Sequence, residues 1–418
     1  MASNISPPQA SATLKTGWLV DPEERRALYA ALDSFRQYRQ AAHYNTTHLR
    51  RLSFYSLPSA HMDILCEPSF SLPETFDAVD QAIAANADIA EAILASGLEM
   101  YREHIDGDAW KGAANPRDVD KARSTIRQLY RDWSREGLPE RHASHSPIFS
   151  ALAAHLPACP VRERDRFRIL LPGAGLGRLV FDLGEAGYTV EGNELSYHQL
   201  IAANYMFSST LSKGHHRLYP WALAFNNHLS RASQLQSVEI PDVLPRPAAA
   251  TEVNEKLRQV PCHARTSMVA GDFCEVYKKP EQQDKFDAVA TCFFIDTAPS
   301  VISYTETIKH CLKPDGLWIN IGPLLWHHEP APTTAEKERQ SSRQGSPAAS
   351  RRARPDASTV PTGSFELSDD EVVALVQRLG FQMVEHRQMP AGATGYIQDP
   401  ASMLQNVYRP SFWVARKR

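Results

Sequence analysis

The sequence predicts an α/β protein with a doubly wound, mostly parallel sheet. From Phe167 onward, short apolar runs of strand type, such as FRILLP at 167–172, alternate with segments of helical pattern. A glycine-rich turn, GAGLG, follows the first of these runs directly. The chain then ends in a helix followed by two strand-like runs. Alternation of strands with helices indicates parallel strands joined by crossover helices.

The elements can be assigned in chain order. Residues 1–20 form a loose tail rich in Ser, Pro and Ala, and residues 21–158 form a helical region. In that region apolar residues such as Leu28, Leu32 and Phe35 recur at helical spacing. Prolines interrupt the pattern, so we expect several helices. The seven strands of the sheet are expected near residues 167–172, 188–194, 267–273, 286–295, 316–325, 381–388 and 410–417.

Two insertions divide the predicted α/β domain, which spans residues 159–418. Residues 208–265 mix Pro, His and Asn with little strand pattern. Residues 329–364 are rich in Pro, Ser, Ala and Arg and have few large apolar side chains, so we expect this segment to be disordered. Its arginines could bind an acidic partner, although a solvated linker is the simpler interpretation.

Composition excludes several classes of function. The formal net charge of -3 gives no reason to expect nucleic acid or a membrane surface as partner, and no apolar run is long enough to span a bilayer. The cysteines form no CxxC pair, which argues against a metal site and against a disulfide scaffold. Reduced thiols indicate a cytoplasmic or nuclear protein.

The glycine turn predicts a nucleotide-type cofactor. Gly173 and Gly175 lie between a strand and a helix, where glycine lets a ligand approach the backbone. Glu194 follows Gly173 by 21 residues, at the end of the next strand, where an acid accepts hydrogen bonds from ribose hydroxyls. Glu191 is a rival for this role. A dinucleotide such as NAD is a competing ligand, but Arg178 stands where the GxGxxG pattern has its last glycine.

Two further features favour S-adenosylmethionine over NAD. The third strand ends at Asp272 and Phe273, which suit an adenine amino group and an adenine ring, respectively. The final helix, strand and strand resemble the class I methyltransferase sheet, whose last strand is inserted antiparallel. The fold class is therefore expected to be a class I Rossmann-like methyltransferase with a seven-stranded sheet and an N-terminal helical region.

Long segments of the chain resemble the carnosine N-methyltransferase family. In the second half these are ILLPGAGLGRLVFDL, GYTVEGNELSYHQL, RLYPWALAFNN, GDFCEVY, FDAVATCFFIDTA and WINIGPLLWH, and in the first half RRLSFYSLPS and KARSTIRQLYRDWSREG. Only the tail, residues 244–263 and the 329–364 insertion fall outside the resemblance. It implies methylation of an imidazole nitrogen of β-alanyl-histidine (carnosine) to give anserine, with S-adenosylmethionine as cofactor, by a homodimer formed through the N-terminal helical region.

The resemblance also implies residue roles. Cofactor binding would fall to Gln128, Arg131, Gly173, Gly175, Glu194, Asp272, Phe273 and Cys292, and substrate binding to Phe293, Asp296, His327, Tyr396 and Tyr408. On sequence alone, an exposed helix face is the simpler interpretation for Gln128 and Arg131, and only the resemblance assigns them to the cofactor. The two tyrosines could equally pack under the last strand, and the segment around Tyr396 departs from the family pattern through its Pro and Gly residues.

Asp296 and His327 are the expected catalytic residues. If Asp296 accepts the N–H of one imidazole nitrogen, the lone pair of the other nitrogen is free to attack the methyl group. Asp296 would also stabilise the positive charge that develops on the ring, so no base is required before attack. Other imidazole compounds, histidine in a protein, and a non-catalytic role for the same fold remain as alternatives.

Overall fold

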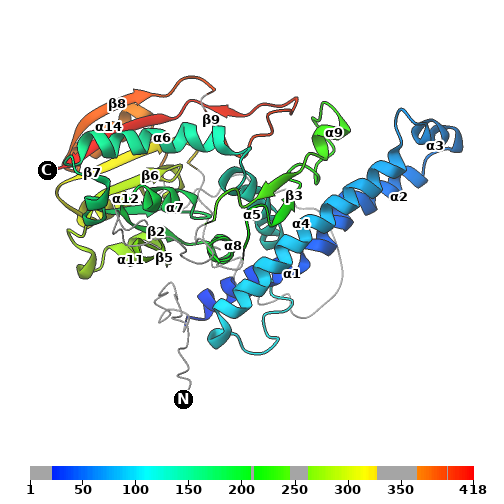
Figure 1. The fold of residues 1–418 in the computed structure, drawn as a ribbon, viewed down its shortest axis with the longest axis horizontal. Helices are drawn as coiled ribbons and strands as arrows, with labels where there is room; N and C mark the ends of the chain where they lie inside the picture. Colours follow the sequence, from blue (N-terminus) through cyan, green and yellow to red (C-terminus); the bar gives the residue numbers. More distant parts are fainter. Residues whose placement is uncertain (1–20, 209–210, 245–261, 327–364, 393) are drawn as a thin grey trace, which may run out of the picture.

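The computed structural model describes residues 21–208, 211–244, 262–326, 365–392 and 394–418. A sheet covered by helices forms the body of the molecule, and a long helical arm projects from it (Figure 1). No helix in the part of the chain described has the length and apolar character needed to cross a bilayer.

The body contains the predicted seven-stranded sheet, in the order β5-β2-β1-β6-β7-β11-β8. Its strands are β1 (Arg168–Pro172), β2 (Thr189–Glu194), β5 (Thr266–Ala270), β6 (Phe286–Cys292), β7 (Leu312–Gly322), β8 (Phe381–Gln388) and β11 (Ser411–Lys417). The first five run parallel to one another, whereas β11 is antiparallel to both β7 and β8. The seven-stranded, mostly parallel sheet with an antiparallel last strand is therefore confirmed.

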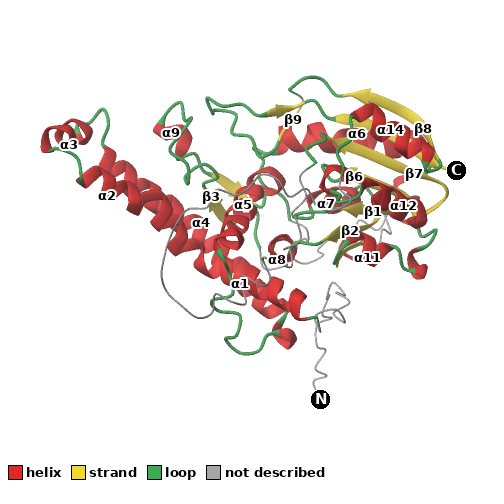
Figure 2. Cartoon of the chain, turned by 180° about the vertical axis from the view of Figure 1, so that it is seen from behind, coloured by secondary structure: helices red, strands yellow, loops and turns green. Residues whose placement is uncertain are grey.

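Helices cover both faces of the sheet (Figure 2). On one face, α6 (Leu138–His155) and α7 (Arg178–Glu185) pack on apolar side chains of β1, β6, β7 and β11. On the other face lie α11 (Phe273–Tyr277), α12 (Val301–Cys311) and α14 (Asp369–Arg378). Alternate residues of a strand point to opposite faces, which explains why Leu317 and Trp318 belong to different cores.

The arm consists mainly of two long helices that lie side by side, α1 (Pro22–His43) and α4 (Leu72–Met100). A π-helical turn at Tyr44–His48 leads into α2 (Leu49–Tyr55) and α3 (Ser59–Cys66) at its far end. The base of the arm packs on α5 (Pro116–Trp133) and α8 (Tyr197–Met206) through one shared apolar core. The predicted division of the N-terminal region into several helices is thus what the structure shows.

Two features differ from the sequence expectation. Helix α6 falls within the predicted helical region, yet Ile148 and Leu152 are buried against the sheet, so this helix belongs to the body. The 208–265 insertion contains β3 (His216–Leu218) and β4 (Val238–Ile240), which pair antiparallel, and a short α9 (Arg231–Gln234). Strands of three residues are too short to leave a readable alternation in sequence. Residues 1–20 and 329–364 lie outside the described residues.

Candidate active site

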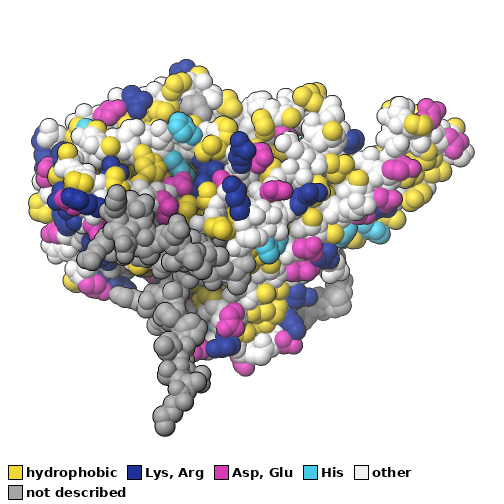
Figure 3. Space-filling view, in the orientation of Figure 1, with side chains coloured by type: hydrophobic (Ala, Val, Ile, Leu, Met, Phe, Trp, Pro, Cys, Tyr) yellow, Lys and Arg dark blue, Asp and Glu magenta, His cyan; other side chains and the backbone are white. Residues whose placement is uncertain are grey.

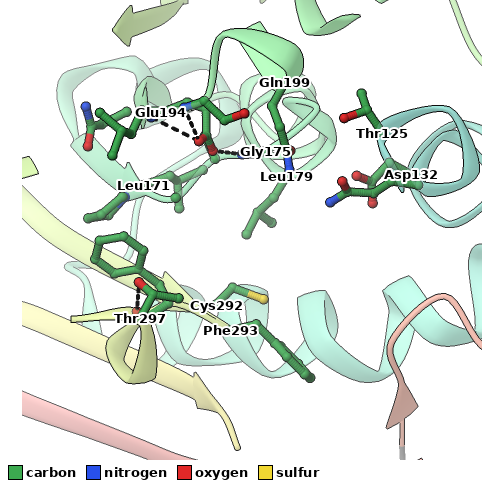
Figure 4. A pocket seen from close by; sticks show the side chains of 18 of the residues that line it. Thr125, Asp132, Leu171, Gly175, Leu179, Glu194, Gln199, Cys292, Phe293 and Thr297 are labelled. Carbon is green, nitrogen blue, oxygen red and sulfur yellow. Dashed lines mark hydrogen bonds between the residues drawn. The ribbon is translucent and has the colours of Figure 1, made fainter. Parts of the chain in front are cut away.

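A cavity of about 670 Å³ opens at the carboxyl ends of β1, β2 and β6, the edge at which open α/β sheets bind ligands. Its wall also includes residues of α5, of the loop after β5 and of the β9 segment (Thr394–Gly395). Figure 4 shows this arrangement, with Glu194 and Gly175 at one end and Cys292 and Phe293 at another. Phe293 and Tyr396 line it together with all eight expected cofactor residues: Gln128, Arg131, Gly173, Gly175, Glu194, Asp272, Phe273 and Cys292.

The glycine loop between β1 and α7 has a conformation that glycine favours. Gly173, Gly175 and Gly177 all have positive φ, at 66°, 57° and 77°. A Cβ atom at Gly173 would lie 2.5 Å from the ring of Phe294, and one at Gly175 would lie 3.0 Å from Gln199 Oε1. Because side chains are excluded here, the backbone of the loop forms an open cradle in the cavity wall.

Glu194 is fixed beside this cradle by three backbone N–H groups. Its Oε2 accepts from Gly175 N at 2.8 Å, and its Oε1 accepts from Leu195 N and Ser196 N at 2.9 Å (Figure 4). Burial raises the pKa of this carboxyl above its ordinary value, although the three N–H groups act in the opposite direction. The lone pairs that remain on its oxygens can accept ribose hydroxyl groups. Its rival, Glu191, instead binds Tyr277 and Lys285 outside the cavity wall.

Asp272 and Phe273 form the side of the cavity that follows β5. Asp272 Oδ1 caps α11 by accepting from Glu275 N at 3.0 Å. Phe273 is only 3% exposed and meets the rings of Phe294 and Tyr304 edge to face. The result is an apolar wall with a carboxylate at its rim, which suits an adenine ring with its amino group.

Gln128 and Arg131 project from α5 into the cavity, and neither lies on an exposed helix face. Gln128 is 4% exposed. Arg131 uses Nε and Nη2 to bind the neighbouring Asp132 at 2.6 and 3.0 Å. Burial lowers the pKa of the guanidinium, but Asp132 more than offsets this, and the pKa is raised well above its ordinary value. Arg131 therefore stays charged, and its guanidinium also lies 4.9 Å from the centroid of the Tyr396 ring.

Cys292 ends β6 at the floor of the cavity. Burial raises the pKa of its thiol to about 11, and the charge of Arg131 only partly counteracts this effect. The thiol is therefore neutral at physiological pH and is a poor nucleophile. A methyl donor can lie next to it without being consumed by it.

The predicted aromatic residues of the substrate site meet in one cluster. The Phe293 ring lies 6.0 Å from both Tyr396 and Tyr408, centroid to centroid, at angles of 36° and 71°. Phe293 has a positive φ of 53°, which is strained for a residue with a side chain and is typical of functional sites. Phe293 and Tyr396 line the cavity, but Tyr408 does not; it lines a second, smaller cavity.

Of the two predicted catalytic residues, the structure describes only Asp296, and it does not line the cavity. Asp296 lies in the 3-10 turn Ile295–Thr297 after β6 and is 2% exposed. Its Oδ2 accepts from Leu325 N at 3.0 Å, and it is not part of the cavity wall, although Phe293 and Thr297 are. His327 lies outside the described residues.

Sequence reasoning missed two groups at this site. Gln199 lines the cavity from α8, and its buried Oε1 has no hydrogen-bond partner among the residues described. Arg178 donates to Asp182 at 2.8 Å, to Asp242 at 2.6 Å and to the carbonyl of Asp132 at 2.8 Å. Asp242 lies in the insertion, far along the chain, so only the spatial arrangement reveals why an arginine replaces the glycine here.

The cavity fits S-adenosylmethionine. The glycine cradle, the fixed Glu194 carboxylate, the apolar wall around Phe273 and the unpartnered Gln199 oxygen all face one space. Together with the antiparallel β11, these features define the chain as a class I S-adenosylmethionine-dependent methyltransferase.

Comparison with known proteins gives the family. A family model described as carnosine N-methyltransferase matches residues 108–418. The carnosine N-methyltransferase of Schizosaccharomyces pombe is 33% identical over 397 residues, covering 95% of this chain and 97% of that protein. The carnosine N-methyltransferase of Mus musculus is 31% identical over 400 residues, covering 94% of this chain and 86% of that protein. The chain belongs to the carnosine N-methyltransferase family.

A solved structure, the Haemonchus contortus phosphoethanolamine N-methyltransferase 2 in complex with S-adenosyl-L-methionine, is also similar. It is 14% identical with a TM-score of 0.36, covering 71% of this chain and 57% of that chain.

Proposed function

We propose that this protein transfers a methyl group from S-adenosylmethionine to an imidazole nitrogen of carnosine, or of a related histidine-containing dipeptide, to give anserine or its counterpart. The observation that carries the proposal is the cavity itself. It joins a cofactor cradle at Gly175 and Glu194 to the aromatic pair Phe293 and Tyr396 at the carboxyl edge of one sheet. The names of the similar proteins supply the substrate.

The cofactor would be held by residues from five segments of the chain. Glu194 would accept the ribose hydroxyl groups, Asp272 and Phe273 would bind the adenine, and Arg131 would bind the methionine carboxylate. Asp132 takes the Nε and Nη2 edge of the Arg131 guanidinium, and within the described part of the chain Nη1 is left for this purpose. When bound, the cofactor supplies an electrophilic methyl group on sulfur.

The imidazole would lie against the aromatic cluster. Phe293 lines the cavity next to Cys292 and has its ring turned toward Tyr396. Stacking against these rings would orient the planar imidazole, and orientation is the main contribution that a protein makes to such a transfer. Tyr408, which lines the second cavity, would contact the part of the dipeptide beyond the ring.

Asp296 would accept the N–H of the ring nitrogen that is not methylated. A neutral imidazole then presents the lone pair of its other nitrogen, and the carboxylate stabilises the charge that develops during transfer. Because Asp296 is buried next to the wall formed by Phe293 and Thr297, the substrate would reach it by displacing part of that wall. His327 would contact the substrate from the segment that follows Leu325.

A substrate panel tests the proposed function. The protein is incubated with S-adenosylmethionine and with carnosine, homocarnosine, free histidine or histidine-containing peptides, and methylation is read by mass. We expect carnosine or homocarnosine to give the highest kcat/KM. Preferential methylation of a longer peptide would assign the activity to protein histidine. Cofactor binding without methylation of any imidazole would refute the proposal.

Asp296→Ala tests the orienting carboxylate. We expect turnover with carnosine to fall by about 100-fold or more, since removal of one preorganised group that stabilises developing charge has effects of this order. Cofactor affinity, measured by calorimetry, should stay within about twofold of the wild-type value. A kcat near that of the wild type would show that Asp296 does not hold the ring. Asp296→Asn, which keeps an acceptor for Leu325 N, controls for loss of the local turn.

A further inference from the structure

A second cavity, of about 300 Å³, lies at the same edge of the sheet as the first. It is bounded by the end of β7, the start of α14, the end of β8 and the start of β11. Residues that line it include Gly322, Leu324, Asp369, Tyr408, Arg409 and Ser411. Its volume is at the lower end of the range found for small-molecule sites.

Two residues of the second cavity lie next to Phe293. Its side chain lines the first cavity, whereas Tyr408, 6.0 Å away ring to ring, lines the second. Gly322 also lines the second cavity, and a Cβ atom there would lie only 3.2 Å from the backbone N and Cα of Phe293. The second cavity therefore lies next to the residue on which the ring of the ligand would rest.

Three polar groups in this cavity have unused hydrogen-bonding capacity. Ser411 is 7% exposed, and its Oγ has no partner among the described residues. Asp369 binds His386 Nε2 through Oδ2 at 2.9 Å, and its Oδ1 accepts no hydrogen bond from another side chain of the described residues. Arg409 forms no ion pair with any residue in the described part of the chain. A buried hydroxyl without a partner costs stability, so its presence in a cavity wall points to a ligand.

We propose that this cavity is the subsite for the charged backbone of the dipeptide, with Asp369 binding the terminal ammonium group, Arg409 the carboxylate and Ser411 Oγ a polar atom of the linking segment. This assignment rests on the proposed function, because it requires the imidazole to lie at Phe293. It extends that function by naming what selects the substrate among imidazole compounds.

The chemistry of the substrate matches this arrangement. In β-alanyl-histidine the ammonium group and the carboxylate are separated by the β-alanyl chain and the amide, so the two charges can reach different walls of a cavity. In free histidine both charges are attached to one carbon and cannot reach both partners. Charge-assisted hydrogen bonds at two separate points would therefore favour the dipeptide over the free amino acid.

Substrate analogues test the two charged contacts separately. We expect Asp369→Asn to raise KM for carnosine about tenfold while leaving KM for N-acetylcarnosine, which lacks the ammonium group, nearly unchanged. Arg409→Gln should raise KM for carnosine by a similar factor but not KM for decarboxylated carnosine. In both variants kcat should stay close to the wild-type value, because the contacts bind the substrate away from the reacting nitrogen.

Matched variants separate binding from a structural role. Asp370→Asn removes the same charge from the next residue of α14, which does not line the cavity, and should leave both KM values unchanged. Ser411→Ala should raise KM for carnosine without lowering the thermal midpoint, since no partner in the described structure loses a bond.

These measurements distinguish failure of the subsite from failure of the proposed function. If Asp369→Asn weakens carnosine and its N-acetyl analogue equally, or weakens neither, the subsite is refuted even though the enzyme methylates carnosine. If the wild type methylates no imidazole dipeptide, the proposed function fails. Calorimetry with carnosine on the wild type and on Asp369→Asn then still decides the subsite, since equal affinities, or an absence of binding to both, would overturn it.

Discussion

Glu194 is the residue on which the cofactor site most depends. Its two carboxylate oxygens are held by three backbone N–H groups, so their direction is fixed before any ligand arrives. Preorganised acceptors of this kind cost no reorganisation on binding. The same burial raises the pKa of the carboxyl, which makes the site sensitive to pH.

We predict that cofactor affinity weakens as pH falls through a pKa above the ordinary value of 4.5 for glutamate. Protonation removes acceptor capacity that the ribose hydroxyls need. Calorimetry as a function of pH would locate this pKa, and Glu194→Gln should bind about tenfold more weakly and lose the pH dependence. An unchanged dependence in Glu194→Gln would assign the titration to another group.

The same shift affects stability in the opposite sense. Because the folded protein raises this pKa, folding favours the protonated carboxyl. The contribution of Glu194 to the free energy of unfolding is therefore present at low pH, below the pKa of the unfolded chain. It is lost as pH rises through the higher folded pKa. Cofactor binding and this contribution to stability thus respond to pH in opposite directions.

We predict that Cys292 resists alkylation. Its thiol pKa of about 11 leaves little thiolate at neutral pH. Treatment with iodoacetamide at pH 7.5 followed by peptide mass mapping should label the exposed Cys66 well before Cys292. Rapid labelling of Cys292 in the folded protein would show that the cavity lowers this pKa.

All the residues predicted to bind the cofactor line the first cavity, whereas only some of those predicted to bind the substrate do, and the reason is local. Gly173, Gly175 and Glu194 lie in short segments at strand ends, where one loop fixes the geometry. Tyr408 and Asp296, by contrast, depend on how distant segments pack, and the structure places Tyr408 in a second cavity and Asp296 outside the wall of the first. The positive φ of Phe293 has no sequence signal, since it is not a glycine.

At the scale of elements, a buried ion network joins the insertion to the cofactor site. Asp242, just beyond β4, accepts from Arg141 of α6 at 3.0 Å and from Arg178 of α7 at 2.6 Å. Arg141 also donates to the carbonyl groups of Arg131 and Ser134 at the end of α5. The network therefore holds α5 against the glycine loop. Its members are separated by many residues, which explains why alternation and spacing predicted the sheet but not this connection.

We predict that Asp242→Ala lowers the free energy of unfolding by about 3 kcal/mol, because it leaves two buried guanidinium groups without this partner. Urea denaturation measures the change. The exposed pair of Arg123 and Asp120 offers a matched control, and Asp120→Ala should cost less than about 1 kcal/mol. If the two variants lose similar free energies of unfolding, the network stabilises the fold no more than an exposed ion pair does.

At the scale of the molecule, the helical arm projects away from the body that contains the sheet. Large apolar side chains are exposed toward its far end: Tyr44, Leu49, Leu52, Tyr55, Ile64 and Phe70. Figure 3 shows hydrophobic side chains at the surface of the projecting arm. Exposed apolar patches of this kind mark interaction surfaces. A homodimer formed through the helical region, as expected from the family resemblance, stays a proposal.

We predict that Leu52→Glu combined with Tyr55→Glu converts a dimer into a monomer in light scattering coupled to gel filtration, since buried charges oppose association. The thermal midpoint at equal subunit concentration and the cofactor affinity report whether the body still folds. A wild-type protein that is monomeric, or a dimer that survives both substitutions, would exclude this surface as the interface.

The most direct test of the account follows the methyl group itself. The protein is incubated with carnosine and S-adenosylmethionine that carries a ¹³C-labelled methyl group, and the product is analysed by NMR. We predict that the label appears on one imidazole nitrogen, with the terminal amino group unmodified. Label on the amino group, or unlabelled carnosine beside a protein that binds the cofactor, would contradict it.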